Sequence, residues 1–367
     1  MSVKICHISS VHPRYDVRIY VKEILSLKTQ GYNVSLLLAD GKGNDKEKQI
    51  YDIGKSSNRI TRILFGLHKL YREALRLNCD IYHFHDPELI TIAKKLKRKG
   101  KKVIYDVHED LPRQMLSKPY LKKFFPKLIS QIVENWENSQ VKQLDYIITS
   151  TPHIKDRFQK ITDKVESIKN FPMLEEFKDS EPTALDKKDQ VCYIGSLTEV
   201  RGIYEIVEAC RELPVNLNIA GNFHDEDYKT KVMNSLGWKD VNYMGYINRS
   251  GISELLNRSL IGIVTLYPIE NHLTSYPVKM FEYMASGIPV IASNFDTWKE
   301  IVEGNECGLC VDSENINEIR SGIKYLLNNP KIAARMGQNG RQAVMDKYNW
   351  TIEEKKLFSI YEKVIKK

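Results

Sequence analysis

Residues 275–293, SYPVKMFEYMASGIPVIAS, combine a short apolar helix with a buried strand, and this unit indicates the fold of the chain. Pro277 suits the first turn of a helix, Gly287 suits its end, and the run PVIAS is strand-like. Glu282 is the one acid in this apolar helix and follows Lys279 by three residues. The pair is either an exposed ion pair or a buried carboxylate that needs donors.

The same alternation of strand-like and helical segments runs through both halves of the chain. Strand-like runs include VKICHIS, YNVSLLLAD, DIYHFH, VIYDVH and IITSTP, and later VCYIGSL, VNLNIAG, VNYMGYI and LIGIVTLYP. This rhythm predicts an α/β fold with doubly wound parallel sheets. A polar stretch between the halves predicts four segments: an N-terminal Rossmann-like domain (1–172), a linker (173–188), a second Rossmann-like domain (189–348) and a closing helix (349–367). Two such domains imply a cleft lined by the loops that follow the strands.

Composition narrows the class of protein. The chain has 367 residues, 42% of them hydrophobic, so it can bury two sizeable cores. The start MSVKICHISS reads as a strand rather than a signal peptide, and no run approaches the roughly 18 apolar residues of a membrane span. We therefore expect a cytoplasmic protein that at most lies on a membrane surface. The lone CxxC pair, Cys307 and Cys310, lacks further ligands nearby, so we predict no metal site.

The net charge of +8 is concentrated in one region. Residues 90–130 contain twelve Lys or Arg and three acids. A local cationic region of this kind suggests an anionic partner, such as nucleic acid, anionic lipid or a phosphorylated substrate.

Two loops could bind a phosphate. The loop GSLTEVRG supplies Gly195 for close backbone approach and Arg201 for charge, just before a helix. The helix that starts near Pro277 directs its first amides toward the preceding loop, and helix N-termini favour anions. A nucleotide held there could offer its ribose hydroxyls to Glu282. The residues alone therefore indicate a nucleotide or nucleotide-sugar enzyme.

These stretches resemble the family 4 glycosyltransferases of the GT-B fold, of the bacterial polysaccharide type. SYPVKMFEYMASGIPVIAS is similar to the family's donor-site helix, and YIGSLTEVRG is similar to its phosphate loop. DIYHFHD and VIYDVHE resemble its amino-terminal strands, and YNWTIEEKKLFSIY resembles its closing helix. The resemblance implies two Rossmann-like domains that face a central cleft, with the C-terminal helix returning to the N-terminal domain.

The resemblance also implies site residues. Glu282 would hold the ribose, Arg201 would bind the diphosphate as leaving group, and His108 would lie near the donor sugar, although a buried core histidine is the alternative. The full donor set is Gly195, Ser196, Arg201, Thr274, Ser275, Tyr276, Pro277, Lys279 and Glu282. The sequence departs from the family pattern at Thr274, where relatives have an acid, and at Ser196, where they have an arginine.

The loop after the first strand, SSVHPRYDVRIY, offers four further residues on the acceptor side, which could equally serve as helix caps and surface charges: His12, Arg14, Asp16 and Arg18. Family members retain the anomeric configuration and need no metal or other cofactor. We therefore expect a metal-independent transfer of a hexosyl or N-acetylhexosaminyl group from a nucleotide-sugar, with UDP the commoner nucleotide. The acceptor would be a glycan or a polyprenyl-diphosphate-linked sugar in surface polysaccharide synthesis, such as O-antigen or capsule.

Residues 113–136 mix lysines with Phe124, Phe125, Leu128 and Trp136, a pattern that suits a helix on an anionic inner-membrane surface. A solvated basic helix packed on the sheet is the alternative. Three rival functions remain open: a nucleotide-sugar epimerase of the same architecture, a metal-dependent transferase that uses the acids of HDEDY (224–228), and a basic nucleic-acid-binding protein. The basic region lacks a stacking platform or binding motif, so we expect no nucleic-acid partner.

Overall fold

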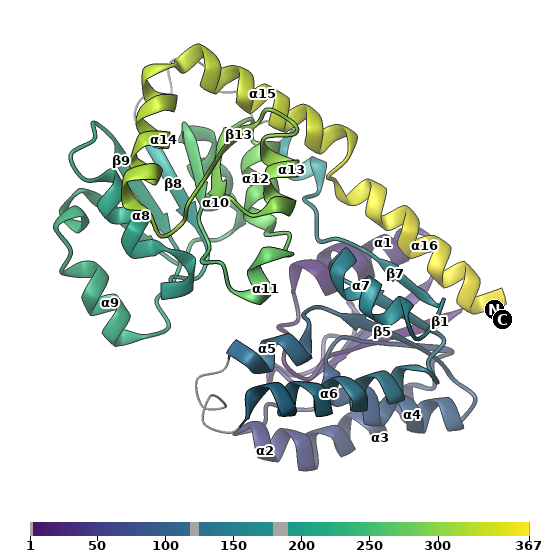
Figure 1. The fold of residues 1–367 in the computed structure, drawn as a ribbon. Helices are drawn as coiled ribbons and strands as arrows, with labels where there is room; N and C mark the ends of the chain where they lie inside the picture. Colours follow the sequence, from purple (N-terminus) through teal and green to yellow (C-terminus); the bar gives the residue numbers. More distant parts are fainter. Residues whose placement is uncertain (1–2, 118–124, 179–189, 367) are drawn as a thin grey trace. The chain divides into compact units, whose positions relative to one another are not determined.

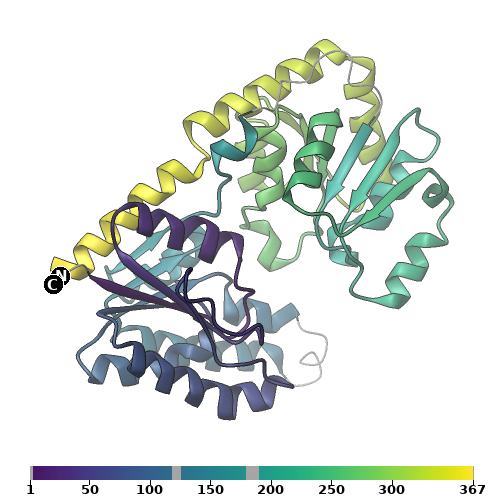
Figure 2. The ribbon, with the colours of Figure 1, turned by 180° about the vertical axis from the view of Figure 1, so that it is seen from behind.

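The computed structural model describes residues 3–117, 125–178 and 190–366. The chain forms two compact units: Met1–Asn170 with Ile352–Lys367, and Phe171–Thr351. Each unit is built around its own parallel sheet with helices on both faces (Figure 1; Figure 2 gives the reverse view). The predicted α/β class with two Rossmann-like domains is confirmed.

The first unit contains a seven-stranded sheet in the order β3-β2-β1-β4-β5-β6-β7. Its strands are β1 (Lys4–Ile8), β2 (Asn33–Leu38), β3 (Ile50–Asp52), β4 (Ile81–Phe84), β5 (Lys102–Val107), β6 (Tyr146–Thr149) and β7 (Val165–Ser167). Each described pair of neighbouring strands is parallel. The strand order reverses between β1 and β4, and ligands of open α/β sheets bind beyond the carboxyl ends of the strands at such a point.

Helical segments cover both faces of this sheet. They are η1 (Val17–Ile24), α1 (Leu25–Thr29), α2 (Arg59–Thr61), η2 (Arg62–Gly66), α3 (Leu67–Leu77), η3 (Pro87–Leu89), α4 (Ile90–Arg98), α5 (Leu111–Ser117), α6 (Pro126–Val141), α7 (Pro152–Gln159) and α16 (Trp350–Lys366). Because side chains alternate along a strand, β1 directs Cys6 and Ile8 into the core formed with α3 and α4. His7 faces the other side, where it contacts Glu23 of η1 and Tyr361 of α16.

The helix α16 returns to the first unit, as predicted. Its apolar residues recur at helical spacing and are buried: Leu357, Ile360, Tyr361 and Val364. The hydroxyl of Tyr361 lies 2.8 Å from Nδ1 of His83 in β4, which fixes the helix against the sheet. The first unit is therefore assembled from two segments that are far apart in sequence.

The second unit contains a six-stranded parallel sheet in the order β10-β9-β8-β11-β12-β13. Its strands are β8 (Gln190–Ile194), β9 (Asn216–Ala220), β10 (Val241–Gly245), β11 (Ile261–Val264), β12 (Val290–Ser293) and β13 (Gly308–Val311). Its helical segments are η5 (Leu174–Phe177), η6 (Glu199–Arg201), α8 (Ile203–Cys210), α9 (Glu226–Met233), η7 (Leu236–Asp240), α10 (Arg249–Arg258), α11 (Glu270–Leu273), α12 (Val278–Ala285), α13 (Asp296–Val302), α14 (Ile316–Asn328) and α15 (Pro330–Asp346).

Both faces of the second sheet are covered by a core. On β8, Val191 and Tyr193 pack with α8 and α14, whereas Cys192 and Ile194 pack with α12 on the opposite face. Strands buried on both faces explain why the sequence shows continuous apolar runs here. The strand order reverses between β8 and β11, so the loops after these two strands define the expected ligand site of this unit.

The boundaries differ from the prediction by a few residues. The first unit ends at Asn170 rather than at residue 172. The predicted linker 173–188 starts inside the second unit, because Phe177 of η5 is buried in the α12 core; residues 179–188 lie outside the described part of the chain. The helix of the 275–293 stretch starts at Val278, with the extended Pro277 as its N-cap residue rather than as its first turn.

Candidate active site

A buried tyrosine in the second half of α12 holds this helix against two central strands. The hydroxyl of Tyr283 accepts a hydrogen bond from the backbone N–H of Ile194 at 3.1 Å and donates to the carbonyl of Ile263 at 3.4 Å. These contacts place α12 against β8 and β11, on either side of the switch point. The loop after β8 and the first turn of α12 are thereby held together.

Two cations converge on the backbone of the loop after β8. Gly195 has a φ of +133°, and a Cβ there would lie 2.7 Å from Nζ of Lys279 and 3.7 Å from Nη1 of Arg201. A larger residue would therefore displace the lysine end as well as strain the backbone. The structure thus brings together Gly195, Arg201 and Lys279, which the sequence assigned to one donor set.

Lys279 is the most unusual group of this set. Its side chain is buried, Nζ lies 3.8 Å from the ring centroid of Tyr193, and Nζ makes no hydrogen bond within the described part of the chain. Burial, and then the charge of Arg201, lower the pKa of Lys279 well below its usual range. Burial without hydrogen-bond partners thus disfavours the charged form of Lys279, and an anion beside Nζ would favour it again.

Gly202 lets the loop turn into α8. It has a φ of +65°, and a Cβ there would lie 2.7 Å from the carbonyl oxygen of Thr265, the residue after β11. Oγ1 of Thr265 is buried and has no hydrogen-bond partner among the described residues. The loops after β8 and β11 therefore pack backbone to backbone, as the closing of an anion site at the switch point requires.

The residues before α12 shape its open N-terminus. No side chain caps the helix. Ser275 donates its hydroxyl to the carbonyl of His272 at 2.9 Å, and the indole N–H of Trp298 donates to the carbonyl of Ser275 at 2.7 Å. The ring of Tyr276, which precedes α12, stacks nearly parallel to the ring of Phe281 within α12. The segment is thus fixed through its own contacts; the amide of Met280 donates to the carbonyl of Pro277 at 3.0 Å, which leaves the amides of Val278 and Lys279 as those that could meet a phosphate.

Glu282 is 6% exposed and already has a protein partner. Arg249 of α10 donates Nη1 to Oε1 of Glu282 at 2.6 Å and also pairs with Glu176. Although burial opposes it, the two carboxylates raise the pKa of Arg249. The sequence suggested an exposed pair with Lys279 or a buried acid that awaits donors; the structure shows a buried acid with one oxygen held by Arg249.

The two positions that depart from the family pattern lie in the same part of the second unit. Thr274 follows α11 as its C-cap residue and is half-buried. Ser196 follows Gly195, and its carbonyl accepts a hydrogen bond from the hydroxyl of Tyr193 at 3.0 Å. His272, which the sequence interpretation missed, donates through Nδ1 to the carbonyl of Tyr267 at 2.9 Å. Burial lowers the pKa of His272, and Arg201 contributes to the shift.

In the first unit, His108 lies just past β5 and is half-buried. Its Nε2 is 2.9 Å from Oδ2 of Asp106 and 3.1 Å from Nδ1 of His85. Although burial opposes it, Arg18 and His108 hold the pKa of Asp106 well below its usual range. Asp106 and His85 therefore orient His108, and both were missed by the sequence interpretation even though the runs DIYHFHD and VIYDVHE contain them.

The four acceptor-side candidates divide into two groups. His12 lies with its ring 4.8 Å from that of His108, and Nδ1 is 3.2 Å from Oδ1 of Asp86. The other three are engaged inside the unit. Arg14 forms a two-bond pair with Asp40, Asp16 caps η1, and Arg18 is buried against Asp106 through Nε and Nη2, both at 2.8 Å. Asp16 is a helix cap, as the alternative expected, whereas Arg14 and Arg18 are buried ion-pair partners rather than the surface charges of that alternative.

Two family models match almost the whole chain. The model "Glycosyltransferase Family 4" matches residues 18–172, and "Glycosyl transferases group 1" matches residues 175–343. The chain belongs to the family 4 glycosyltransferases. The matched ranges contain the second-unit site and the His85, Asp106 and His108 group of the first unit, whereas His12, Arg14 and Asp16 precede the first range.

Similar proteins agree with this assignment. The glycosyltransferase is 22% identical over 326 residues to an uncharacterized glycosyltransferase of Methanocaldococcus jannaschii, which covers 84% of this chain and 79% of that protein. Sucrose-phosphate synthase from Thermosynechococcus elongatus has a TM-score of 0.78 at 17% identity and covers 99% of both chains. HepE from Anabaena, solved in complex with UDP and glucose, has a TM-score of 0.74 at 14% identity, with 98% and 99% coverage. The GT-B fold is thereby shown.

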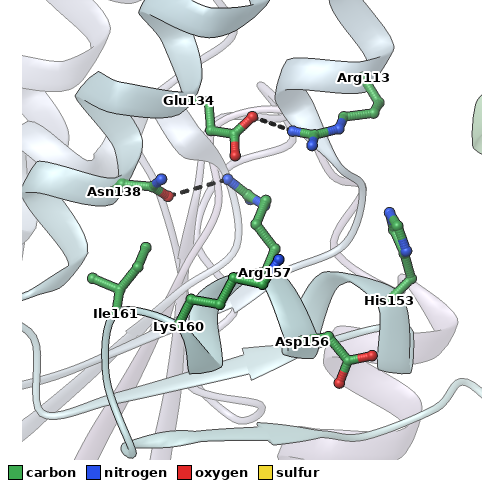
Figure 3. A pocket seen from close by; sticks show the side chains of 8 residues that line it. All are labelled: Arg113, Glu134, Asn138, His153, Asp156, Arg157, Lys160 and Ile161. Atoms are coloured by element: carbon green, nitrogen blue, oxygen red, sulfur yellow. Dashed lines mark hydrogen bonds and ion pairs between the residues drawn. The ribbon is translucent and has the colours of Figure 1, made fainter.

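The glycosyltransferase also has a polar pocket of about 250 Å³ in its first unit. Residues of α5, α6 and α7 and the turn that follows line it (Figure 3): Arg113, Glu134, Asn138, His153, Asp156, Arg157, Lys160 and Ile161. Arg113 pairs with Glu134, and Arg157 pairs with Glu137 at 2.8 Å and contacts Asn138. These cations are already neutralised, so the pocket is polar rather than strongly cationic.

The helix α6 exposes an apolar stripe. Phe125 precedes the helix and is 82% exposed, and Leu128, Ile132 and Trp136 follow at helical spacing with 60%, 58% and 39% exposure. Lys127 is exposed beside them, whereas Lys122, Lys123 and Phe124 of the predicted patch lie outside the described residues. Among the described helices of the glycosyltransferase, none combines the length and apolarity needed to cross a membrane.

Proposed function

We propose that this glycosyltransferase transfers a hexosyl or N-acetylhexosaminyl group from a UDP-sugar, with retention of anomeric configuration. The acceptor in this proposal is a glycan or a polyprenyl-diphosphate-linked sugar of surface polysaccharide synthesis. The observation that carries the donor assignment is the buried amino group of Lys279, which lies beside Gly195 and Arg201 and has no hydrogen-bond partner among the described residues. The UDP and glucose found in the complex of HepE support the choice of nucleotide.

In this proposal the residues of the second unit stabilise the leaving group. Arg201, Lys279 and the first amides of α12 bind the diphosphate, and Glu282 binds the ribose hydroxyls through the carboxylate oxygen that Arg249 does not hold. The bond from the anomeric carbon to the diphosphate breaks through an oxocarbenium-like state while the acceptor oxygen forms its bond to the same carbon. The departing phosphate oxygen takes the acceptor's proton. Fixed cations and amides stabilise the developing charge, so the proposal needs no metal at the diphosphate.

We keep His108 as the proposed sugar-facing residue of the first unit. Asp106 and His85 fix its Nε2, so its ring orientation is set before any substrate binds. The polar pocket among α5, α6 and α7 and the neighbouring His12 are the candidate contacts for an acceptor. Thr274, Ser196, Ser275 and Tyr276 complete the proposed donor set through backbone and hydroxyl groups.

A binding series on the full chain tests the donor assignment. We expect UDP to bind more tightly than GDP or ADP in isothermal titration calorimetry, and UDP-sugars to be consumed only when a glycan or lipid-linked acceptor is present. Added chelator should leave turnover unchanged if no exchangeable metal takes part. Binding of none of the three nucleotides would contradict the proposed donor site.

The same assay separates the rival functions. Release of an epimerised sugar from a UDP-sugar without acceptor would identify an epimerase instead. Loss of turnover with chelator, restored by a divalent metal, would support a metal-dependent transferase. Salt-dependent duplex binding together with an absence of UDP binding would support the nucleic-acid alternative.

We further propose that α6 lies on an anionic membrane surface and presents the enzyme to a lipid-linked acceptor. The exposed stripe of Phe125, Leu128, Ile132 and Trp136 can enter the interfacial region while lysines remain at the headgroups. Burial of one large apolar side chain contributes about 1.5–3 kcal/mol, so exchanging two of them for polar residues should weaken binding by about 100-fold or more.

The variant Leu128→Gln/Ile132→Gln should lose co-sedimentation with vesicles that contain phosphatidylglycerol and should keep its affinity for UDP. The matched control is Leu236→Gln/Tyr246→Gln, which removes two apolar side chains that are 69% and 78% exposed in the second unit. Equal vesicle binding by both double variants would refute a membrane role for α6. Binding that persists on neutral phosphatidylcholine would show that the anionic headgroup is not required.

A further inference from the structure

A cluster of buried histidines occupies one face of the first sheet. His7 of β1 and His83 of β4 are register partners, and His85 follows His83 by two residues and so faces the same side. The segment η1 packs on this face and contributes Glu23. All four side chains are buried, and one ligand-type atom of each lies within 4.8 Å of the other three.

The cluster has coordination capacity that the protein does not use. Nε2 of His83 and both carboxylate oxygens of Glu23 are buried and accept or donate no hydrogen bond within the described part of the chain. Glu23 does form an ion pair: its Oε1 lies 3.2 Å from Nε of Arg18. Its Oε2 faces Nδ1 of His7 at 3.9 Å, and that Nδ1 is 3.0 Å from Nε2 of His85. Buried polar atoms of this kind are rarely left without a partner.

Each of the four side chains has a second polar atom, and that atom contacts a residue outside the proposed ligand set. The hydroxyl of Tyr361 lies 2.8 Å from Nδ1 of His83 and 3.3 Å from Nε2 of His7. Nδ1 of His85 is 3.3 Å from Oδ2 of Asp106. Arg18 holds the outer oxygen of Glu23, as noted above. Metal-ligating histidines typically use their second nitrogen in this way, which fixes the ring orientation and the tautomer.

The imidazoles of the cluster can accept a cation directly, whereas its carboxyl group must first lose a proton. Burial lowers the pKa of His7 and of His83 well below the usual range and lowers the pKa of His85 to about 4, so the imidazoles keep a lone pair for a metal at physiological pH. Burial, and then the charge of Asp106, raise the pKa of Glu23 well above its usual range. Binding of a divalent ion would therefore displace a proton from Glu23.

We propose that His7, Glu23, His83 and His85 bind a structural Zn²⁺ ion. Three imidazole nitrogens and one carboxylate oxygen form a ligand set typical of zinc, and four protein ligands leave no open position for a reacting water. The 3.0 Å between two of the nitrogens is close to the roughly 3.3 Å edge of a tetrahedron with 2.0 Å bonds. Such an ion stabilises the contact between the sheet, η1 and α16. The ion takes no part in diphosphate binding. The zinc proposal can therefore be tested independently of the proposed transfer reaction.

The metal content of the full chain tests this proposal. The protein is unfolded with denaturant and chelator, refolded with Zn²⁺, passed over a desalting column and measured by inductively coupled plasma mass spectrometry. We expect about one zinc per chain for the wild type and for His68→Gln, a control that alters an exposed histidine of α3. We expect loss of the zinc in His83→Gln. Refolding with Co²⁺ should give the intense visible absorption of a four-coordinate site.

A second variant covers the case in which His83→Gln does not fold. Tyr361→Phe keeps the ring in the core and removes only the hydroxyl, so it should fold and bind zinc about 10–100-fold more weakly in competition with a chromophoric chelator. Wild-type protein that refolds without retaining zinc would overturn the proposal. It would show that a chain of hydrogen bonds through neutral tautomers, with a protonated Glu23, satisfies the cluster instead. A Tyr361→Phe affinity equal to that of the wild type would likewise exclude these ligands.

Discussion

The variant Lys279→Met should lose UDP-sugar turnover and, at the same time, unfold at a higher temperature than the wild type. Methionine has nearly the same length and fills the space over the ring of Tyr193, but it cannot bind a phosphate. Removing one preorganised electrostatic donor typically lowers kcat by about 100- to 1,000-fold. The buried amine has no hydrogen-bond partner among the described residues, so its removal should stabilise the free protein by about 1–3 kcal/mol.

Kinetics and thermal unfolding of the same preparations measure both effects. The matched control is Lys324→Met, an exposed lysine of α14, which should change neither quantity. A variant that is inactive and also less stable would point to a structural lysine rather than to a phosphate-binding one. A fully active Lys279→Met enzyme would place the diphosphate elsewhere.

The lowered pKa of Lys279 also predicts a pH dependence of donor affinity. The free enzyme holds this amine neutral above its lowered pKa, and a bound diphosphate restores the charged form. Binding therefore takes up a proton between the lowered pKa and the restored one, and affinity falls by up to about tenfold per pH unit across that window. A UDP-sugar is the proper ligand, because its diphosphate does not titrate there. Calorimetry in two buffers of different ionisation enthalpy should detect the proton, and Lys279→Met should not show it.

The variant Glu282→Gln should bind UDP about 10- to 100-fold more weakly and should no longer distinguish it from 2′-deoxy-UDP. A hydrogen bond to a charged group contributes about 1.5–3 kcal/mol, and the amide retains the shape of the side chain while losing the charge. Titration calorimetry with both nucleotides, on both proteins, gives the four affinities that isolate the contact to the hydroxyl.

A loss of affinity that is equal for the two nucleotides would assign Glu282 to holding Arg249 instead of the ribose. The control for that reading is Glu254→Gln, which breaks an exposed glutamate–arginine pair within α10 and should leave both affinities unchanged. Far-UV circular dichroism confirms that the three proteins fold alike.

The fold and the grouping of Gly195, Arg201 and Lys279 could be predicted from sequence because their signals are local. Strand and helix periods define the elements, and the stretch that contains Pro277 and Glu282 carries both the helix and its turn. The partners of the site residues were not accessible, because they come from other elements. Arg249 reaches Glu282 from α10, 33 positions earlier, and no pattern in the sequence marks it.

The histidine cluster is an intermediate case. His7, His83 and His85 each occupy a strand-like run, and the period of two places each on a definite face. What the sequence lacks is the strand order: only the adjacency of β1 and β4 makes His7 and His83 neighbours. With that order assumed from the doubly wound class, the cluster could have been predicted; Glu23 could not, because its approach depends on how η1 packs.

The return of α16 to the first unit has a consequence for how the protein forms in the cell. During synthesis the seven strands of the first sheet emerge first, yet Tyr361 leaves the ribosome only after the entire second unit has been made. Until then, His7 and His83 lack their hydroxyl partner, and the face of the sheet that α16 covers is open to water. The unit that is translated first is therefore the one that is completed last, and chaperones have the whole of that interval in which to act on it.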